Sequence, residues 1–156
     1  MANWIEVGKK APAFTLTSDD GKKVKLSELQ GSPVVLYFYP KDDTPGCTKE
    51  ACAFRDRKAE MEKLGAKVLG VSPDTVEKHA KFRDKYNLNF PLLADPDHAV
   101  AEKYGAWREK SMYGKKFMGI QRSTYLIDAS GRVAQVWPNV KVAGHDEQVL
   151  QALENL

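Results

Sequence analysis

The alternation of hydrophobic and polar residues predicts a short β-hairpin at the start of the chain and a fully buried strand after it. Residues 12–17 and 24–26 alternate apolar and polar side chains, and Ser-Asp-Asp-Gly at 18–21 between them is typical of a turn. Residues 34–39, Val-Val-Leu-Tyr-Phe-Tyr, are apolar or aromatic at every position. Such a run is expected for a central strand that is covered on both faces.

Helical spacing of apolar residues predicts a long helix soon after this strand. Thr44 is a typical N-cap residue, and Pro45 fits the first helical position because its missing N–H would have no helical partner there. Apolar residues then recur between charged ones as far as Leu64, and Gly65 is typical of a helix end. The sequence therefore predicts a helix that begins at Pro45 and ends near Gly65.

The rest of the chain alternates predicted strands and helices. Strands are predicted at 68–71, 90–93, 123–127 and 132–137, and helices from Asp74 or Thr75 to about Tyr86, over about 97–104 and over about 146–153. Strand–helix–strand units followed by an antiparallel pair predict an α/β fold, with a central mixed sheet flanked by helices and an N-terminal hairpin extension. A chain of 156 residues is long enough for one domain, residues 1–156.

Residues 105–121 are rich in Gly, Lys and Met and show no clean period, so they predict a long loop. Trp107, Met112, Tyr113, Phe117 and Met118 lie in this segment. Loops carry function disproportionately, so these side chains could line a substrate or partner surface. Packing of the same side chains over the sheet is an equally good explanation.

Composition and charge disfavour several classes of protein. Hydrophobic residues make up 42% of the chain and charged residues 29%, as in ordinary globular proteins. The 24 basic residues are spread among 21 acidic ones without a run of five, so no nucleic-acid partner is expected. The N-terminus has no secretory-signal pattern and no apolar run could span a bilayer, so the sequence predicts a cytoplasmic protein without a membrane partner.

Both cysteines of the chain lie in the predicted long helix. Cys47 would occupy the third helical position, where free backbone N–H groups and the positive end of the helix dipole stabilise a thiolate. The thiolate, not the thiol, is the nucleophilic form of cysteine. The alternative is a buried cysteine that packs as a small apolar residue, and it is less favoured because the Thr-Pro-Gly start of the helix is specific.

Cys52 lies five residues after Cys47, a spacing that matters for disulfide formation. Five helical residues rotate by about 140° and rise by about 7.5 Å, which places the two Cα atoms roughly 8–9 Å apart. A disulfide tolerates at most about 7 Å, so the first turn of the helix would have to unwind before the two sulfurs could bond. Two thiols without a nearby histidine do not match zinc spacing, and the sequence indicates no metal and no other cofactor.

A peroxide is an electrophile that such a thiolate can reduce. Attack on the O–O bond forms a sulfenic acid, which can condense with a second thiol. The reaction needs a donor for the attacked oxygen and a cation for the leaving oxyanion. Thr44 and the helix N–H groups are candidates for the donor, and Arg122, before the strand at 123–127, is the candidate cation. Arg55, two turns along the helix, is better explained as a solvated or ion-paired side chain.

Residues 40–47, Pro-Lys-Asp-Asp-Thr-Pro-Gly-Cys, resemble the peroxiredoxin signature Pro-x-x-x-Thr-x-x-Cys. The resemblance covers essentially the whole chain, including Gly-Ile-Gln-Arg-Ser-Thr-Tyr-Leu-Ile-Asp at 119–128. With a second cysteine five residues after the first, the sequence resembles the Q-type branch of this family, also called bacterioferritin comigratory protein. This branch implies a thioredoxin-like fold with an N-terminal extension. It also implies a thiol peroxidase for hydrogen peroxide and organic hydroperoxides, recycled by thioredoxin and serving antioxidant defence.

The resemblance also implies roles for individual residues. Cys47 would be the peroxidatic cysteine, Pro40 would shield its sulfur, and Thr44 and Arg122 would position the two peroxide oxygens. Glu50 matches a position that is often acidic in the wider family, where it would orient Arg122.

Two further residues are candidates for the surroundings of the site. Tyr39, next to Pro40, either flanks the pocket or belongs to the core. Some Q-type members keep the resolving cysteine on the following helix, but this chain has none there, so Cys52 is the internal candidate for that role.

Two other function classes remain open on the sequence. A general thiol–disulfide oxidoreductase is disfavoured because such enzymes use Cys-x-x-Cys, whose closer spacing needs no unwinding. A redox sensor or chaperone, in which oxidation of Cys47 alters a partner without catalysis, is the non-enzymatic alternative. Q-type relatives are often monomeric and the sequence shows no obvious exposed apolar stripe, so a monomer is expected.

Overall fold

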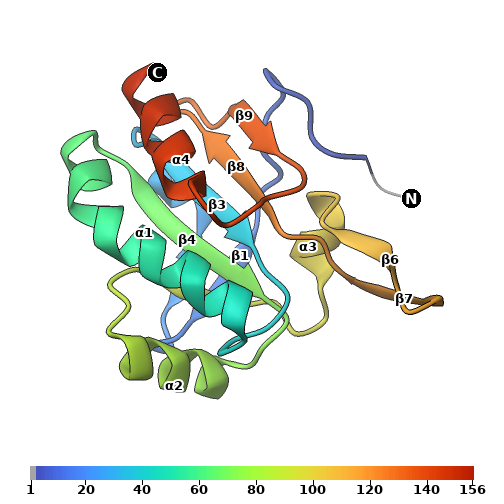
Figure 1. The fold of residues 1–156 in the computed structure, drawn as a ribbon. Coiled ribbons are helices and arrows are strands. Elements are labelled where there is room, and N and C mark those ends of the chain that lie inside the picture. Colours follow the sequence, from blue (N-terminus) through green and yellow to red (C-terminus); the bar gives the residue numbers. More distant parts are fainter. Residues whose placement is uncertain (1–2) are drawn as a thin grey trace.

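A seven-stranded sheet is the centre of the computed structural model, which describes residues 3–156 (Figure 1). The elements in chain order are β1 Thr15–Ser18, β2 Lys23–Lys25, the 3₁₀ helix η1 Leu26–Leu29, β3 Val34–Phe38, α1 Pro45–Lys63, β4 Lys67–Ser72, α2 Val76–Tyr86, β5 Leu92–Ala94, α3 Ala99–Lys103, β6 Trp107–Met112, β7 Lys115–Ile120, β8 Ser123–Ile127, β9 Val133–Trp137 and α4 His145–Glu154. The order of strands and helices predicted from residue 34 onward is confirmed except at 105–121, where the structure has two strands.

The sheet is mixed, as predicted. Its strand order is β2-β1-β5-β4-β3-β8-β9, with β3, β4 and β5 parallel and β1, β8 and β9 antiparallel to their neighbours. The predicted N-terminal hairpin forms and joins the same sheet, because β1 pairs with β5. All five residues of β3 are buried, as expected for a central strand.

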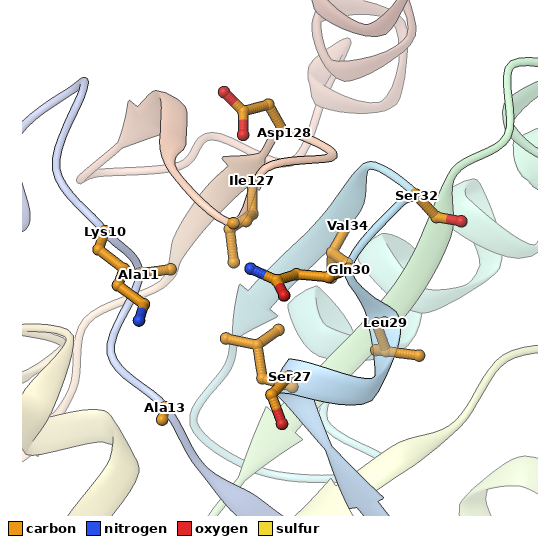
Figure 2. Close-up of a pocket in the computed structure, with 12 residues that line it drawn as sticks. Lys10, Ala11, Ala13, Ser27, Leu29, Gln30, Ser32, Val34, Ile127 and Asp128 are labelled. Carbon is orange, nitrogen blue, oxygen red and sulfur yellow. The ribbon is translucent and has the colours of Figure 1, made fainter.

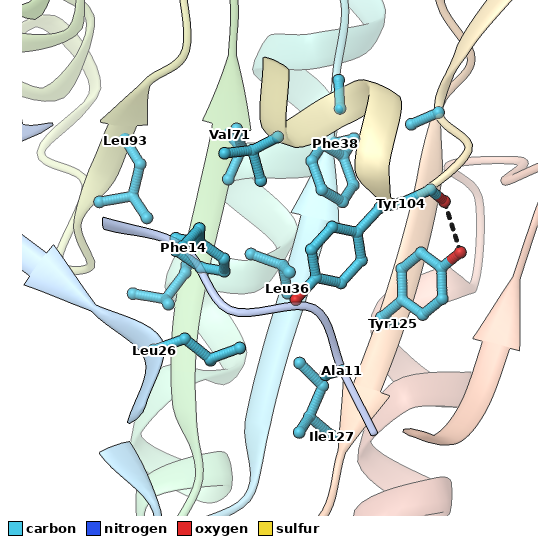
Figure 3. Close-up of a cluster of buried hydrophobic side chains, with 14 of the residues drawn as sticks. Ala11, Phe14, Leu26, Leu36, Phe38, Val71, Leu93, Tyr104, Tyr125 and Ile127 are labelled. Atoms are coloured by element: carbon cyan, nitrogen blue, oxygen red, sulfur yellow. Dashed lines mark hydrogen bonds between the residues drawn. The ribbon is translucent and has the colours of Figure 1, made fainter. Parts of the chain in front are cut away.

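Alternate side chains of β3 enter two different cores. Tyr37 packs on the face that α1, α2 and α4 cover, together with Cys47 and Phe54 of α1. Leu36 and Phe38 point to the opposite face. There they meet the N-terminal segment and α3, as Figure 3 shows around Tyr104 and Tyr125. The Tyr125 hydroxyl donates to the Tyr104 carbonyl at 2.6 Å, so both of these buried polar groups have a hydrogen-bond partner.

The predicted loop at 105–121 is wrong, since β6 and β7 form an antiparallel hairpin that makes a separate two-stranded sheet. Tyr113 and Gly114 at its tip have φ angles of 52° and 77°, as a type I′ turn requires. The hairpin escaped detection because most of its side chains are exposed on both faces, so no alternation of buried and exposed residues marks its strands.

The remaining boundaries differ from the predictions by a few residues. The third helix is shorter than predicted, spanning Ala99–Lys103, and the last helix begins one residue earlier, at His145. Within residues 3–156, no helix combines the length and apolar character needed to cross a membrane.

Candidate active site

Helix α1 begins at Pro45, as predicted, and this places Cys47 in its first turn. Thr44 is extended, with φ −103° and ψ 155°, and its carbonyl accepts the first helical hydrogen bond from Thr48 N at 2.8 Å. The Thr44 hydroxyl does not cap the helix, however, because it donates to the Lys41 carbonyl at 2.8 Å. Backbone N–H groups of the first turn therefore have no side-chain cap from Thr44.

The sheet brings Arg122 to Cys47 although 75 residues separate them in sequence. Strand β8 pairs with β3 so that Ser123 lies opposite Phe38, which puts the residue before β8 beside the end of β3. Arg122 is held there through its carbonyl, which accepts a bond from Val140 N at 3.0 Å. Its Nη2 lies 3.3 Å from Cys47 Sγ, so a guanidinium faces the sulfur of a residue that is only 2% exposed.

Glu50, one turn after Cys47, fixes the other side of the guanidinium. Arg122 Nη1 donates to Glu50 Oε1 at 2.6 Å, so one planar guanidinium joins the carboxyl to the sulfur. Burial raises the pKa of Glu50 to about 7, an effect that the charge and hydrogen bond of Arg122 only partly offset. Desolvation opposes the charge on Arg122, but Glu50 and then Cys47 outweigh it and raise the pKa of the guanidinium.

The raised pKa of Glu50 predicts a specific pH dependence of stability. Between about pH 4.5 and about pH 7 the folded protein binds a proton at Glu50 that the unfolded chain releases, so stability falls as pH rises. The stabilisation is fully present below about pH 4.5 and lost above about pH 7, with a total of about 3 kcal/mol. Denaturant unfolding across this range should show the decline in the wild type and not in Glu50→Gln. Glu60→Gln, at an exposed carboxyl of the same helix, is the control, and parallel curves for wild type and Glu50→Gln would contradict the prediction.

Two residues that the sequence did not single out also bear on this geometry. A Cβ atom at Gly46 would lie 3.0 Å from Arg122 Nη2, so glycine leaves room for the guanidinium. Lys110 of β6 donates to the Ile120 carbonyl at 2.8 Å. Burial and then Arg122 lower the pKa of Lys110, while Cys47 opposes that change, which indicates that the β6–β7 hairpin borders the site. Lys110 was missed because its segment was predicted to be a loop.

Pro40 and Tyr39 lie where β3 leads into the segment before α1. Pro40 is half-buried, and Tyr39 is 1% exposed, with its ring stacked on Tyr37 at 5.4 Å between centroids. The Tyr39 hydroxyl donates to Asp42 Oδ1 at 2.6 Å, so it is directed away from bulk water into a buried polar network. Tyr39 thus belongs to the core and supports the segment that carries Thr44.

That polar network anchors the segment between β3 and α1. His79 Nδ1 lies 2.6 Å from Asp42 Oδ2, and its Nε2 lies 3.0 Å from the Leu93 carbonyl, which can only accept a hydrogen bond. Asp42 N also donates to Asp74 Oδ2 at 2.8 Å. This network could not be found from the sequence, because its residues come from three separate segments.

Asp42, Asp74 and His79 are also the one group of potential metal ligands found among residues 3–156. Their ligand atoms lie within 4.8 Å of one another and all three residues are buried. Both carboxylate oxygens of Asp42, Oδ2 of Asp74 and both ring nitrogens of His79 already have hydrogen-bond partners, which are groups of this network, Ser72 and the Leu93 carbonyl. The group is therefore explained as a hydrogen-bonded anchor.

Cys52 lies on the same helix as Cys47 but faces a different environment. It is half-buried and lines an open groove of about 560 Å³ beside Thr44, Pro45 and Tyr86, whereas Cys47 belongs to a buried apolar cluster. Both thiols are free in the intact helix α1. The groove gives Cys52 access to solvent that Cys47 lacks.

A separate cavity of about 120 Å³ lies at the far end of the sheet (Figure 2). Val34, at the start of β3, lines it together with Leu29 and Ile127. Cys47 follows the opposite end of β3, so this cavity is not part of the thiol site.

Comparison with known proteins identifies the family of this chain. The AhpC/TSA family model matches residues 7–136. Peroxiredoxin Bcp of Bacillus subtilis is 51% identical over 152 residues, which cover 97% of each chain. A structure of the Xanthomonas campestris bacterioferritin comigratory protein is 42% identical, with a TM-score of 0.90 over 96% of this chain and 98% of that one. The Xylella fastidiosa PrxQ C47S mutant is 35% identical, with a TM-score of 0.93 over 99% and 98%.

These likenesses extend over nearly the full length of the chain, and the observed fold agrees with them. The predicted thioredoxin-like fold and the resemblance to Q-type peroxiredoxins are thereby confirmed. This chain belongs to the AhpC/TSA family and is a peroxiredoxin, an enzyme that reduces peroxides with a cysteine thiol.

Proposed function

We propose that Cys47 is the peroxidatic cysteine of this thiol peroxidase. The observation that carries the proposal is the guanidinium of Arg122, with Nη2 3.3 Å from Cys47 Sγ and Nη1 2.6 Å from Glu50 Oε1. A fixed cation at the sulfur stabilises the thiolate and then the oxyanion that leaves as the O–O bond breaks. The sulfur forms a bond to one peroxide oxygen, giving a sulfenic acid, and the other oxygen departs as water or an alcohol after protonation.

Thr44 and Pro40 complete the proposed site. Thr44 lies directly before the helix that carries Cys47, and its hydroxyl would turn from the Lys41 carbonyl to bond a peroxide oxygen. Half-buried Pro40 would limit the approach of water to the sulfur. Glu50 is assigned the positioning of Arg122, because it holds the guanidinium without reaching the sulfur itself.

Cys52 is proposed as the resolving cysteine. Its thiol would attack the sulfenic sulfur of Cys47, release water and form a disulfide, which requires the first turns of α1 to unwind. An incoming dithiol, for which thioredoxin is our proposal, would reach the disulfide from the groove beside Cys52 and supply the two electrons. The Xanthomonas campestris relative has an alkyl peroxide reduction activity, and we propose organic hydroperoxides as well as hydrogen peroxide as substrates here. We further propose a cytoplasmic, single-domain monomer.

Cys52→Ser is expected to keep the first oxidation fast but to stop turnover supported by thioredoxin and its reductase. The sulfenic acid then has no internal partner, so Cys47 should accumulate as sulfenic and over-oxidised forms. Mass spectrometry after one equivalent of peroxide measures this accumulation, and consumption of reductant measures turnover. An unchanged catalytic cycle in Cys52→Ser would show that Cys52 is not the resolving cysteine.

Oxidation of the wild type should raise amide exchange over residues 45–53, because disulfide formation requires that segment to unwind. Exchange in Cys52→Ser after oxidation is the matched control, since no disulfide can form. Stoichiometric oxidation without turnover would instead favour a redox sensor, and peroxide-independent insulin reduction would favour a general oxidoreductase.

A further inference from the structure

The exposed apolar side chains of this protein gather at the tip of the β6–β7 hairpin. Seven large apolar residues are notably exposed among residues 3–156, and four of them lie within 112–118, which we call the hairpin tip. They are Met112, Tyr113, Phe117 and Met118, with exposed fractions of 58%, 97%, 43% and 48%. Apolar groups gathered in this way mark an interaction surface more often than scattered ones do.

The net charge of the hairpin equals the net charge of the whole chain. Residues 107–120 contain four basic residues and one acidic one, a net charge of +3, which equals the net charge of all 156 residues. The other 20 basic and 20 acidic residues balance. Two of the hairpin cations, Lys115 and Lys116, are exposed at the tip beside the apolar residues. The partner of this surface must therefore be both anionic and able to accept apolar side chains.

The strand register sorts these groups onto two faces. Lys110 lies opposite Phe117 and Met112 lies opposite Lys115, so these four side chains share one face of the hairpin. That face contains no acidic residue, because Glu109 points to the other face, where Lys116 Nζ lies 3.7 Å from its Oε1. Lys110 on this face donates to the Ile120 carbonyl at 2.8 Å, and Ile120 lies two residues before Arg122 in the sequence.

The shape of the hairpin favours a lipid surface over a protein or a second copy. β6 and β7 project from the edge of the molecule (Figure 1), so the tip is convex and narrow, whereas stable protein interfaces bury about 800 Å² on each partner. Two hairpins of charge +3 would repel each other. Aromatic and Met side chains flanked by lysines are suited to the boundary between anionic headgroups and acyl chains.

We propose that the hairpin tip docks this protein onto anionic phospholipid bilayers, with Lys115 and Lys116 at the headgroups and Met112, Tyr113 and Phe117 in the interface. The expectation of no membrane partner rested on the absence of a spanning segment, which a surface-docked protein does not need. Docking itself is independent of the proposed peroxidase mechanism. Its consequence, reduction of hydroperoxides held in the bilayer, rests on that mechanism.

Vesicle flotation without peroxide tests the docking. Wild-type protein should float with phosphatidylcholine vesicles that contain phosphatidylglycerol, should not float with phosphatidylcholine alone, and should be released as salt rises. Lys115→Glu/Lys116→Glu should weaken binding by more than about tenfold. Lys22→Glu/Lys23→Glu makes the same charge change on the exposed β1–β2 hairpin and is the matched control.

The apolar contribution is tested separately. Met112→Ser/Phe117→Ser should weaken vesicle binding without a change in charge, whereas Val7→Ser/Leu64→Ser, at comparably exposed positions, should not. Hydrogen peroxide turnover should be unchanged in all four double variants, which separates failure of docking from failure of the proposed mechanism. Three results would overturn the proposal: no binding of wild type to anionic vesicles at low salt, equal loss in the control variants, or a dimer in solution that the tip variants disrupt.

Discussion

Replacing Cys47 with serine is expected to reduce the rate of peroxide reduction by at least about 10³-fold, equivalent to a barrier increase of about 4 kcal/mol. A serine hydroxyl does not ionise at neutral pH and cannot form a sulfenic acid, so neither the attack nor the oxidised intermediate is available. The fold should survive, because serine is similar in size and its oxygen can still accept a bond from Arg122 Nη2. Stopped-flow mixing with hydrogen peroxide and a coupled turnover assay measure the loss.

Cys52→Ser provides the control for Cys47→Ser. Both variants lose a thiol from α1, yet only the one at Cys47 should abolish the first oxidation. Retention of peroxide reduction in Cys47→Ser, with a correct mass and native circular dichroism, would refute the assignment of Cys47.

Replacing Arg122 with methionine is expected to slow the attack on peroxide by about 10²–10³-fold, the usual cost of removing one preorganised group that stabilises developing charge. It should also destabilise the fold, because Glu50 would remain 2% exposed without its cation. The double variant Arg122→Met/Glu50→Gln should recover most of the stability but not the rate. Stopped-flow rates and denaturant unfolding of the single and double variants separate the two effects.

The choice of control for Arg122 comes from α1 itself. Arg55 Nη1 donates to the Tyr86 carbonyl at 2.6 Å, far along the helix from its first turn, so Arg55→Met should leave the oxidation rate within about twofold. Arg122→Lys should fall between wild type and Arg122→Met, because an ammonium keeps the charge but cannot reproduce the planar fork to sulfur and carboxylate. Equal rates of peroxide attack for wild type and Arg122→Met would show that the guanidinium does not take part in the reaction.

The local features of the site follow from residues that are neighbours in sequence. The buried run at 34–39, the break after it and the Thr-Pro pair are sufficient to place the start of α1 and the position of Cys47 within its first turn. The same helical geometry predicts that the Cys52 sulfur cannot bond to the Cys47 sulfur in an intact helix. Such predictions succeed because backbone sterics and turn chemistry act over a few residues.

The hairpin at 107–120 shows where local patterns fail. Its strands pair with each other and little else, so their side chains carry no alternation of buried and exposed positions, and the Tyr-Gly turn was the remaining signal. The net charge of +3 could be counted from the sequence, but its meaning depended on the hairpin being present.

The sequence by itself determined that a cysteine stands at a helix start, that a second lies five residues on, and that Arg122 precedes a strand. The tertiary structure decided that Arg122 reaches Cys47, because the β3–β8 register brings the ends of two distant strands together. It also decided that Glu50 is buried against Arg122 and that Asp42 is held by His79. These contacts join segments far apart in the chain, and their energies depend on burial and orientation that only the packed sheet and helices establish.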